Sequence, residues 1–582
     1  MNYINFASKY DKYPETVIPG FEDQAFNGWK DIVKVISKEL EHRNVLIVDC
    51  YPGVHDQELL SNFEKCRNFD LIIRMDDIFF ESEKITEMMK PFLTDDRVRG
   101  KYYYGIITDF MDSSKLETAR KKVRETVSEN KKVLVYGFGA YLVTEKGLLV
   151  YADMTRWEIQ LRYRKGESNF KANNPDEDSL KKIKRGYFIE WRIADRHKEK
   201  LLDRIDYYLD SEAEDDPNMV CGEGLRTALK SLVNRPFRMV PYFDPGVWGG
   251  QWMKEVCLLD PSRKNYAWSF DGVPEENSLF FRFGKVRVAS PAMNLTKYRP
   301  VEFLGKKTFS RFGAEFPIRF DFLDTMNGQN LSLQVHPTTE YIHEKFGMAY
   351  TQDESYYILD CQGDGGVFLG LKEGIDPKEM IDELKEAQTG KIRFDDSKYI
   401  NFFKAKKFDH YLIPAGTIHC SSSDCMVLEI SATPYNFTFK LWDWDRLGLD
   451  GLPRPIHIED GEQVIQFNRT TEWVKANLVN RFEKLTENAD YTETRTGLHE
   501  LEFIESRVYD VRTAVTFRSN GEFCMCNLVD GQEALIESPD GLFEPYEVHY
   551  AETFIIPANA GDAVIRTVDG KPVKIIKANV RY

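Results

Sequence analysis

Cysteine and histidine are both scarce in this sequence. Its 582 residues include nine cysteines and ten histidines, and Cys524 and Cys526 are the closest cysteine pair. This low cysteine density excludes a scaffold held by disulfides and predicts reduced thiols in the cytoplasm. Because ten histidines leave few candidates for an imidazole base or metal ligand, each histidine that lies in a motif is informative.

Long apolar runs are absent as well. No uninterrupted apolar stretch reaches the roughly 18–20 residues that a membrane span needs. The first residues, MNYINFASKY, lack the basic and apolar regions of a secretory signal. We therefore expect a cytoplasmic protein that does not enter a membrane. No period of 20–50 residues repeats, which argues against a solenoid.

Positive charge is in deficit. The chain has 78 lysines and arginines against 94 aspartates and glutamates, for a formal net charge of −16. Since a nucleic-acid backbone is bound by a basic surface, this balance excludes a general nucleic-acid binder. Hydrophobic residues at 42% and charged residues at 30% are typical of a globular protein. A prior of about 150 residues per domain predicts roughly three or four domains.

The first part of the chain is typical of an α/β domain. Three apolar runs indicate buried strands, at 45–48, 71–73 and 132–136. Residues 113–131 have helical character, and strands that alternate with helices predict a doubly wound, mostly parallel sheet. The acidic segment 211–217 and the Arg235-Pro236 that follows it are typical of a domain boundary. We therefore assign residues 1–235 to this domain.

A degenerate phosphate-binding loop follows the first strand. Residues 49–56 (DCYPGVHD) stand where such a loop would open a helix, but they hold one glycine and no Gly-Lys-Ser/Thr. The region resembles the uridine-kinase group of P-loop kinases, whose strand-end signature is similar to 74–80 (RMDDIFF). The further matches are strand ends at 106–109 and 148–153 and lid-like Arg156, Arg162, Arg164 and Arg192. The resemblance implies a P-loop-kinase-like domain with a structural or regulatory role, and active phosphoryl transfer is the alternative.

Beyond Pro236 the sequence predicts a mainly-β region. Short aromatic and β-branched runs are broken by Gly, Pro, Asn and Asp, as in a sandwich or barrel. Helices are expected over 376–388 and 471–481. Along 331–337 (LSLQVHP), polar and apolar residues alternate, which places Ser332, Gln334 and His336 on one face of a strand. Polar groups that face a barrel cavity need partners there.

Candidate metal ligands lie in this β region. Glu354 follows His336, and His419 ends a turn built by proline and glycine, 413–419 (IPAGTIH), at the start of a strand. Together with Gln334 they offer nitrogen and oxygen ligands suited to zinc, with a position left open for substrate or water. Taken singly, each residue is more often a hydrogen-bonded core residue. Their occurrence together favours a metal site.

The residues from about Met239 to Tyr582 resemble the type I phosphomannose isomerases, which are zinc-dependent cupin enzymes. The motifs that carry the resemblance are 247–250 (VWGG), 316–318 with 323–324, LSLQVHP, IPAGTIH, 438–446 (TFKLWDWDR) and 453–459 (PRPIHIE). The resemblance implies cupin (jelly-roll) barrels, with a catalytic zinc cupin domain carrying helical insertions over 236–496. A second, metal-free cupin domain is expected over 497–582, because its turn at 550–558 is not followed by histidine.

The resemblance also implies roles for single residues. The zinc ligands carried over by motif are Gln334, His336, Glu354 and His419, with one zinc per chain. The residues expected to contact the substrate are Ser332, Trp248, Lys440 and Arg446. The catalytic residues implied are Glu354 and Lys440. Two positions depart from the family, because Gln352 and Lys440 replace a lysine and a catalytic arginine.

The predicted activity is aldose–ketose isomerisation. Mannose 6-phosphate and fructose 6-phosphate would be interconverted by zinc-assisted proton transfer through a cis-enediol. The expected partner is a small-molecule hexose phosphate, with no nucleic acid and no membrane, and a homo-oligomer stays open. The two departures keep a second class open, a non-catalytic or altered-specificity sugar-phosphate-binding cupin. A bifunctional isomerase–kinase is a third alternative, opposed by the missing Gly-Lys-Ser/Thr.

Overall fold

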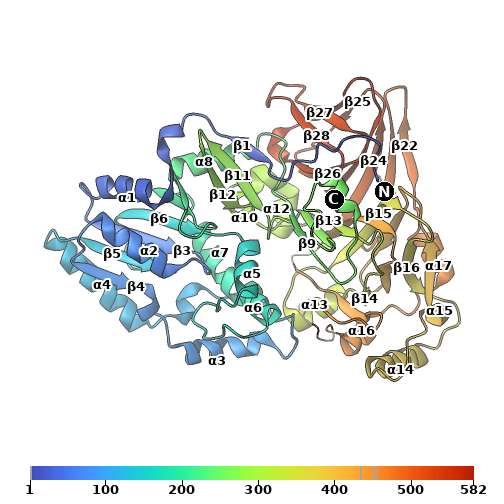
Figure 1. Cartoon of the computed structure of the whole chain (residues 1–582), viewed down its shortest axis with the longest axis horizontal. Helices are drawn as coiled ribbons and strands as arrows, with labels where there is room; N and C mark the ends of the chain where they lie inside the picture. The colour runs from blue at the N-terminus through green and yellow to red at the C-terminus, as the bar shows by residue number, and fades with distance from the viewer. Residues whose placement is uncertain (1–2, 433–434, 450, 452–453, 455) are drawn as a thin grey trace. The chain divides into compact units, whose positions relative to one another are not determined.

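The computed structural model describes residues 3–432, 435–449, 451, 454 and 456–582, which form two compact units (Figure 1). The α/β unit comprises Glu15–Ser231 and Ser278–Tyr298. The β unit comprises Met1–Pro14, Leu232–Asn277 and Arg299–Tyr582. Ser278–Tyr298 therefore belongs to the α/β unit although it lies, in sequence, inside the predicted catalytic cupin domain. The division of the chain at residues 235 and 496 stays a proposal.

A seven-stranded sheet forms the centre of the α/β unit, in the order β2-β8-β7-β6-β3-β5-β4 (Figure 1). Its strands are β2 (Ala25–Asn27), β3 (Val45–Cys50), β4 (Leu71–Arg74), β5 (Val133–Gly137), β6 (Leu148–Asp153), β7 (Tyr207–Asp210) and β8 (Asn218–Cys221). The five strands β3 to β7 pair in parallel, whereas β2 and β8 are antiparallel. The three predicted strands coincide with β3, β4 and β5 within two residues. The mostly parallel sheet is confirmed.

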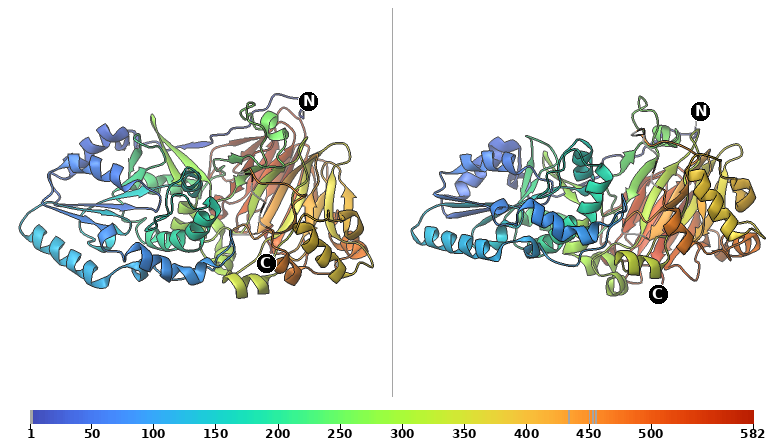
Figure 2. Two further views of the ribbon diagram at one scale, coloured as in Figure 1. Left: turned by 60° about the horizontal axis from the view of Figure 1, so that its bottom comes forward. Right: turned by 90° about the horizontal axis from the view of Figure 1, so that it is seen from below.

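Helices cover both faces of this sheet, with α1 and α4 on opposite sides (Figure 2). The helices of the unit are α1 (Gly28–Glu39), α2 (Asp56–Phe63), α3 (Ser82–Leu93), α4 (Ser113–Ser128), α5 (Arg156–Arg164), α6 (Ser179–Arg185), α7 (Trp191–Glu199), α8 (Gly222–Leu232) and α10 (Met293–Tyr298). Leu46 and Val48 of β3 pack with Ile36 of α1 and Phe63 of α2 in one buried core. A small sheet of β1 (Glu15–Val17), β11 (Ser278–Phe283) and β12 (Val286–Pro291) completes the unit.

Two pairs of antiparallel sheets build the β unit. In the first sheet pair the strand orders are β18-β15-β20-β13-β10-β9 and β17-β16-β19-β14-β21. These strands are β9 (Tyr242–Asp244), β10 (Trp268–Gly272), β13 (Arg319–Asp324), β14 (Leu333–Val335), β15 (Asp353–Cys361), β16 (Gly366–Leu371), β17 (Ile400–Lys404), β18 (His410–Ile413), β19 (His419–Ser421), β20 (Cys425–Ala432) and β21 (Phe439–Trp442). The mainly-β character predicted beyond Pro236 is confirmed.

The second sheet pair follows in sequence, with the orders β22-β23-β24-β31-β26-β29 and β25-β30-β27-β28. Its strands are β22 (Glu483–Glu487), β23 (Tyr491–Gly497), β24 (Ile504–Val511), β25 (Ala514–Phe517), β26 (Cys524–Asp530), β27 (Glu533–Glu537), β28 (Tyr546–His549), β29 (Thr553–Ile556), β30 (Ala563–Thr567) and β31 (Val573–Val580). Cys526, Leu528, Ile536 and Phe554 lie in its buried core. This pair therefore has an apolar interior of its own.

Helices connect the strands of the β unit. They are α9 (Trp252–Val256), α11 (Pro300–Leu304), α12 (Lys306–Phe312), α13 (Thr339–Phe346), α14 (Pro377–Gln388), α15 (Asp396–Tyr399), α16 (Ile458–Val464) and α17 (Thr471–Asn477). The two predicted helices occur as α14 and α17. Asp376 starts α14 by accepting hydrogen bonds from the N–H groups of Lys378 and Glu379 at 2.8 and 3.2 Å. In the described part of the chain, no helix is long and apolar enough to cross a membrane.

His410 is a buried histidine in the first sheet pair that makes stability depend on pH. Neither ring nitrogen has a hydrogen-bond partner among the described residues, and burial lowers the pKa of His410 to about 3. Because the ring is neutral in the folded chain, it does not lower the stability at pH values above the ordinary histidine pKa of about 6.5. As the pH falls from there toward 3, stability is lost, because the unfolded chain binds the proton first.

We expect this group alone to lower the free energy of unfolding by about 2 kcal/mol between pH 6.5 and pH 5. Thermal unfolding of the wild type and of His410→Gln, recorded across this pH range, measures the difference. The variant is expected to lose less stability on acidification. Equal pH dependence of the two proteins would contradict the assignment.

Candidate metal centre

Three neighbouring strands of the five-stranded sheet bring polar side chains into one row. Gln334 of β14 lies directly opposite His419 of β19 and, on its other side, opposite Lys440 of β21. Because directly opposite residues of antiparallel strands share a face of the sheet, the three side chains point the same way. The alternation along 331–337 adds His336 to this face.

His336, Glu354 and His419 form a buried cluster. His336 Nε2 lies 3.0 Å from Glu354 Oε2, and His419 Nε2 lies 2.8 Å from Glu354 Oε1. Both histidines are 0% exposed and Glu354 is 2% exposed. One ligand atom of each residue lies within 4.8 Å of the others, close enough to hold one metal ion. The structure thus brings together three of the four predicted zinc ligands, and Gln334 adjoins them.

Backbone carbonyls orient both imidazole rings. His336 Nδ1 lies 3.1 Å from the carbonyl oxygen of Phe437, and His419 Nδ1 lies 2.9 Å from that of Thr417. Each Nδ1–H therefore donates to the backbone and leaves the lone pair of Nε2 directed at Glu354. A histidine that binds a metal through one nitrogen commonly donates the other N–H in this way.

The donor set fits a zinc ion. Among the described residues, His336 Nε2 and Glu354 Oε1 have no hydrogen-bond partner of acceptable geometry, although both are buried. Lone pairs that converge in a buried site repel one another unless a cation lies between them. The amide nitrogen of Gln334 lies 3.2 Å from His419 Nε2, and rotating the amide by half a turn would present its oxygen there as a fourth candidate ligand. Two imidazole nitrogens with carboxylate and amide oxygens suit zinc.

Gln352 orients the central carboxylate. Its Nε2 donates to Glu354 Oε2 at 3.0 Å, and its Oε1 accepts the N–H of Phe437 at 3.1 Å. Burial raises the pKa of Glu354, and positive charge on the rings of His336 and His419 lowers it well below its usual range. A metal ion held by the same three residues would likewise favour the ionised carboxylate. The glutamine that departs from the family pattern serves as a neutral hydrogen-bond donor.

Two buried acids beside Glu354 were missed by the sequence reasoning. Glu429 of β20 lies directly opposite Asp321 of β13 and Tyr356 of β15, and Tyr356 shares a strand face with Glu354. Burial and the carboxylates of Glu354 and Asp321 raise the pKa of Glu429 well above its usual range. Burial raises the pKa of Asp321 to about 7. The sequence did hold one signal for the missed acid Glu429. Glu429 and Ser431, two residues apart, are polar in the otherwise apolar run 425–432.

A charged network surrounds Ser332. The hydroxyl of Ser332 donates to Asp443 Oδ1 at 2.7 Å, and Arg446 pairs with the same carboxylate at 2.7 Å. Arg446 also donates to the carbonyl of Asn330 at 2.6 Å. Arg454, to which the sequence reasoning gave no role, pairs with Asp443 at 2.9 Å and donates to Ser332 Oγ at 3.1 Å. Arg446 is thus engaged by Asp443, and Arg454 is the guanidinium beside Ser332.

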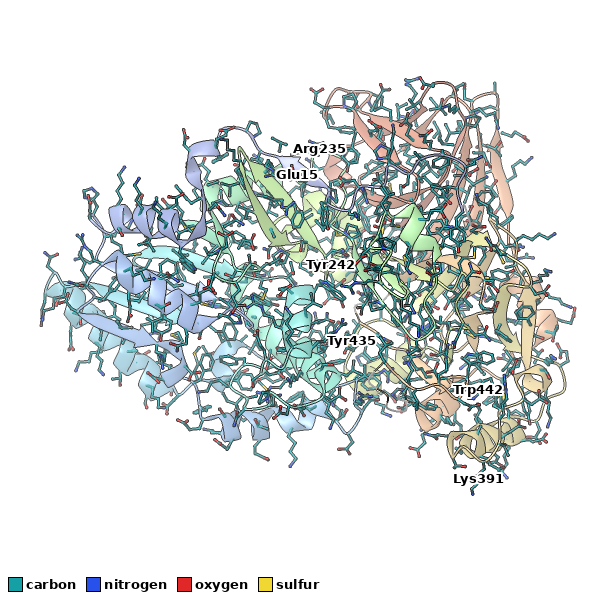
Figure 3. The ribbon with its side chains drawn as sticks, in the orientation of Figure 1. Glu15, Arg235, Tyr242, Lys391, Tyr435 and Trp442 are labelled. Atoms are coloured by element: carbon teal, nitrogen blue, oxygen red, sulfur yellow. The ribbon has the colours of Figure 1, made fainter. Side chains whose placement is uncertain are left out.

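The remaining predicted residues lie near β21 and in the core. Trp248 is 1% exposed and packs edge-on against Trp268, with ring centroids 4.6 Å apart. Its contact with a substrate stays a prediction. Trp442, at the end of β21 (Figure 3), is 4.3 Å from Trp444 between ring centroids, and this packing supports the strand that carries Lys440. Of the 453–459 motif, Pro453 and Pro455 lie outside the described residues.

The loop after β3 is poorly suited to phosphate. The helix that follows it, α2, begins at Asp56, where a phosphate-binding loop would place a lysine. Burial and the charge of Asp76 raise the pKa of Asp56 to about 6. Arg162 donates to the carbonyl of Gly53 at 2.8 Å and so occupies the loop itself.

The predicted strand end at 106–109 was wrong, because Asp109 accepts the Ile106 N–H at 2.8 Å and closes a 3-10 turn there.

The other lid-like arginines also make contacts within the α/β unit. Arg156 pairs with Asp195, Arg164 lies 5.1 Å from the ring centroid of Trp157, and Arg192 donates to the carbonyl of Tyr187 at 3.0 Å.

A second group of possible ligands lies at the surface of the second sheet pair. Glu533, Glu547 and His549 come close to one another there. Lys9 forms an ion pair with Glu533 and lies 3.9 Å from Glu547. Since an amine already neutralises this group, it differs from the buried cluster at Glu354, and the metal-free character of residues 497–582 stays a prediction.

Comparison with known proteins gives relatives of one kind. The chain is 26% identical over 243 residues to the mannose-6-phosphate isomerase ManA of Bacillus subtilis, covering 40% of this chain and 69% of the relative. It is 32% identical over 155 residues to the probable mannose-6-phosphate isomerase GmuF of the same organism, covering 26% of this chain and 45% of the relative. The relatives are mannose-6-phosphate isomerases. They are similar to this chain, and GmuF is matched over less than half its length.

Two further comparisons concern families and solved structures. A family model described as a domain of unknown function (DUF8485) matches residues 28–234, which are contained almost entirely in the α/β unit. The crystal structure of the mannose 6-phosphate isomerase from Bacillus subtilis aligns with a TM-score of 0.48 at 18% identity, covering 59% of this chain and 99% of that one.

Proposed function

We propose that the β unit is a zinc-dependent isomerase that interconverts mannose 6-phosphate and fructose 6-phosphate in a cupin barrel formed by the first sheet pair. The observation that carries the proposal is the buried cluster of His336, Glu354 and His419, whose rings are oriented by backbone carbonyls. The mannose-6-phosphate isomerase relatives support the substrate class. Gln334, His336, Glu354 and His419 would hold one zinc ion per chain.

The reaction needs a carbonyl to be polarised and a proton to be moved between neighbouring carbons. A bound zinc ion would supply the polarisation of the carbonyl, because it withdraws charge from substrate oxygens. For the second we assign Glu429 and Asp321, because their carboxyl groups lie on the strand face that carries Glu354. Burial raises the pKa of Asp321 to about 7, which suits a group that takes and returns a proton at neutral pH. Gln352 holds the Glu354 carboxylate in place.

Lys440 is the proposed anchor for the negative charge of the substrate. It lies in register with Gln334 on the face that carries the cluster. An ammonium binds a phosphate as a point charge, without the bidentate geometry of an arginine. The guanidinium of Arg454 at Ser332 is a second cation on this side of the sheet.

Replacing Lys440 with methionine is expected to lower kcat/KM about 10- to 150-fold, the effect of losing one charge-assisted hydrogen bond worth about 1.5–3 kcal/mol. Most of the change should appear in KM, since the charge binds a part of the substrate that does not react. Lys440→Arg is the matched control and should keep most of the activity. Steady-state kinetics with unchanged zinc content in all three proteins measures the effect, and an unchanged KM for Lys440→Met would exclude this anchor.

Elemental analysis and a coupled isomerase assay on the full chain test the function. We expect one zinc per chain and turnover of mannose 6-phosphate. A chain that binds zinc but turns over no hexose 6-phosphate would exclude the isomerase. It would then favour the alternative, a sugar-phosphate-binding cupin without catalysis.

For the α/β unit we infer a kinase-like fold without phosphoryl transfer. The parallel sheet with helices on both faces supports the fold. The acidic start of α2 at Asp56 and the bond from Arg162 to Gly53 argue against a bound triphosphate. A structural or regulatory role agrees with both observations.

A further inference from the structure

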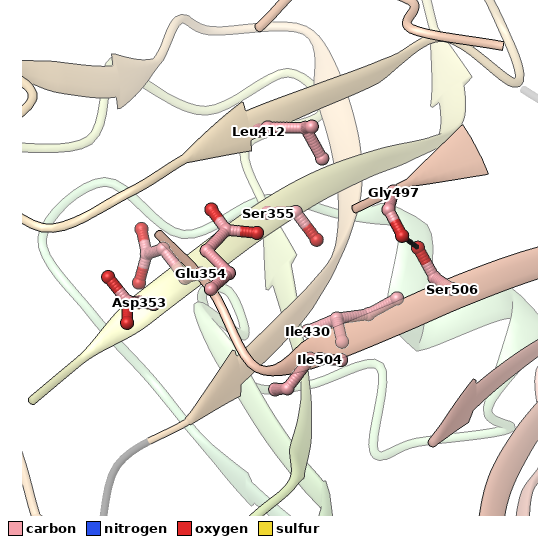
Figure 4. A pocket seen from close by; sticks show the side chains of 9 residues that line it. Asp353, Glu354, Ser355, Leu412, Ile430, Gly497, Ile504 and Ser506 are labelled. Carbon is pink, nitrogen blue, oxygen red and sulfur yellow. Dashed lines mark hydrogen bonds between the residues drawn. The ribbon is translucent and has the colours of Figure 1, made fainter. Parts of the chain in front are cut away.

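Two cysteine thiols from neighbouring strands of the β unit lie side by side. Cys361 ends β15, Cys425 begins β20, and the two residues are directly opposite each other in the antiparallel ladder. Their Sγ atoms are 3.5 Å apart, and both are thiols. Figure 4 shows the opposite end of this ladder, with Glu354 and Ser355 on β15. The thiol pair therefore lies on the strand that carries a proposed zinc ligand, seven residues away from it.

The backbone makes the two cysteines a close pair. The N–H of Thr325 donates to the carbonyl of Cys425 at 2.9 Å, and the N–H of Cys425 donates to the hydroxyl of Thr325 at 3.1 Å. Because Cys425 directs its backbone groups at Thr325, it forms a non-hydrogen-bonded pair with Cys361. The Cα atoms of such a pair are about 4.5 Å apart, within the range of about 4.4–6.8 Å that a disulfide spans. Side-chain rotation can therefore bring the sulfur atoms to bonding distance.

A glycine leaves room for both sulfur atoms. Residues 362–365 form the turn between β15 and β16, which is closed by a hydrogen bond of 3.0 Å from the N–H of Gly365 to the carbonyl of Gln362. A Cβ atom at Gly365 would lie 2.7 Å from Cys361 Sγ and 3.0 Å from Cys425 Sγ. Since these distances are shorter than van der Waals contact, a larger residue here would push the sulfur atoms from their places.

Cys361 is the thiol that a reagent can reach. It is half-buried and precedes the exposed residues Gly363 and Asp364, whereas Cys425 is 0% exposed. A hydrogen bond with the Cys425 thiol lowers the pKa of Cys361, while burial and the carboxylate of Asp360 act in the opposite direction. Because the thiolate is the nucleophile in disulfide exchange, Cys361 is expected to react first.

We propose that Cys361 and Cys425 are a site of reversible thiol oxidation, at which a small-molecule disulfide is exchanged for a cross-strand disulfide bond. The Cys361 thiolate attacks one sulfur of the small disulfide, whose S–S bond breaks and releases a thiolate. This thiolate takes the proton of Cys425, and the Cys425 sulfur then attacks Cys361 and expels the second thiolate. The two cysteines are thereby oxidised, and the small disulfide is reduced to two thiols.

The new bond would join the two ends of the segment 361–425. Closing this loop removes conformational freedom from the unfolded chain, so oxidation should raise the melting temperature of the β unit, by about 3–10 °C. The bond would also fix β15 against β20, the strands that carry Glu354 and Glu429. The inference requires neither a bound zinc ion nor the proposed isomerase.

The test exposes the full, reduced chain to oxidised glutathione at neutral pH. We expect two of the nine thiols to be lost and peptide mapping by mass spectrometry to join Cys361 to Cys425. Dithiothreitol should restore both thiols and the original melting temperature. In Cys425→Ser the reaction should stop at a mixed disulfide of Cys361 with glutathione. In Cys361→Ser the buried thiol of Cys425 should stay reduced.

The second thiol pair of the β unit is an internal control. Cys524 and Cys526 lie two residues apart on β26, with their Sγ atoms 3.8 Å apart. Since Cα atoms two residues apart in a strand are separated by about 6.4–6.8 Å, at the upper limit for a disulfide, this pair should stay reduced. Cys221→Ser is the matched control variant, because it removes another half-buried thiol, and it should form the bond between Cys361 and Cys425 as the wild type does.

Several results would overturn the proposal. One is that Cys361 and Cys425 stay reduced in oxidised glutathione. Another is a mixed disulfide that persists on Cys361 of the wild type, since Cys425 would then be unable to complete the exchange. A melting temperature lowered by oxidation would show that the sheet must distort to accept the bond. If a serine variant fails to fold, peptide mapping and the melting temperature of the wild type still decide.

Discussion

Replacing His419 with alanine is expected to abolish zinc binding and lower isomerase activity by more than about 1000-fold, since a metal that polarises a carbonyl contributes several kcal/mol. His419 Nε2 lies 2.8 Å from Glu354 Oε1, in the middle of the cluster. Without the imidazole, three candidate ligands remain. Elemental analysis after dialysis against a weak chelator measures the zinc, and the coupled assay measures the activity.

The chain should stay folded in this variant, because the fold rests on apolar cores in both sheet pairs. Far-UV circular dichroism and thermal unfolding check this. His343→Ala is the matched control, since His343 is an exposed histidine on α13. It should keep full zinc and full activity. Full zinc occupancy in His419→Ala would refute the ligand assignment.

Glu429→Gln is expected to lower kcat about 100- to 10 000-fold while zinc stays bound, the range that general acid–base catalysis contributes. The amide keeps the size and the polarity of the side chain but cannot exchange a proton. Glu429 is buried opposite Asp321 and is not one of the proposed ligands. This variant should therefore lose activity and keep its zinc, whereas His419→Ala should lose both.

A second buried glutamate, which is not one of the proposed site residues, provides the control for Glu429. Glu505 of β24 is buried in the second sheet pair and pairs with Arg507. Glu505→Gln should leave kcat within about twofold of the wild type, because residues that share no interaction partners act independently. If Glu429→Gln keeps wild-type kcat, Glu429 is not the proton-transfer group, and Asp321→Asn becomes the variant to measure.

Local sequence patterns identified much of the candidate site. A strand turns alternate residues to one side, so Ser332, Gln334 and His336 were placed on a common face without a structure. The glycine and proline around His419 predicted the turn, and Gly416 indeed adopts a positive φ. Motif order then predicted that Glu354 joins the histidines. The distances of 2.8 and 3.0 Å agree with that expectation.

Cross-strand neighbours were beyond such reasoning. Glu429 and Asp321 are more than 100 residues apart in sequence and meet because β20 and β13 pair in one register. Arg454 reaches Ser332, and Arg446 is engaged by Asp443, through long-range packing. The same holds for Ser278–Tyr298, which joins the α/β unit. A one-residue change of register between β20 and β13 would turn the side chain of Glu429 or of Asp321 to the other face.

The amino-acid sequence by itself determined the parallel sheet of the first unit, the mainly-β character of the rest and the set of candidate ligands. These follow from hydrophobic periodicity and turn chemistry, which act between residues a few positions apart. The tertiary structure alone decided which acids lie beside Glu354 and how Gln352 and the backbone orient the ligands. Such contacts depend on strand register and on the packing of whole sheets, and these are properties of the folded chain as a whole.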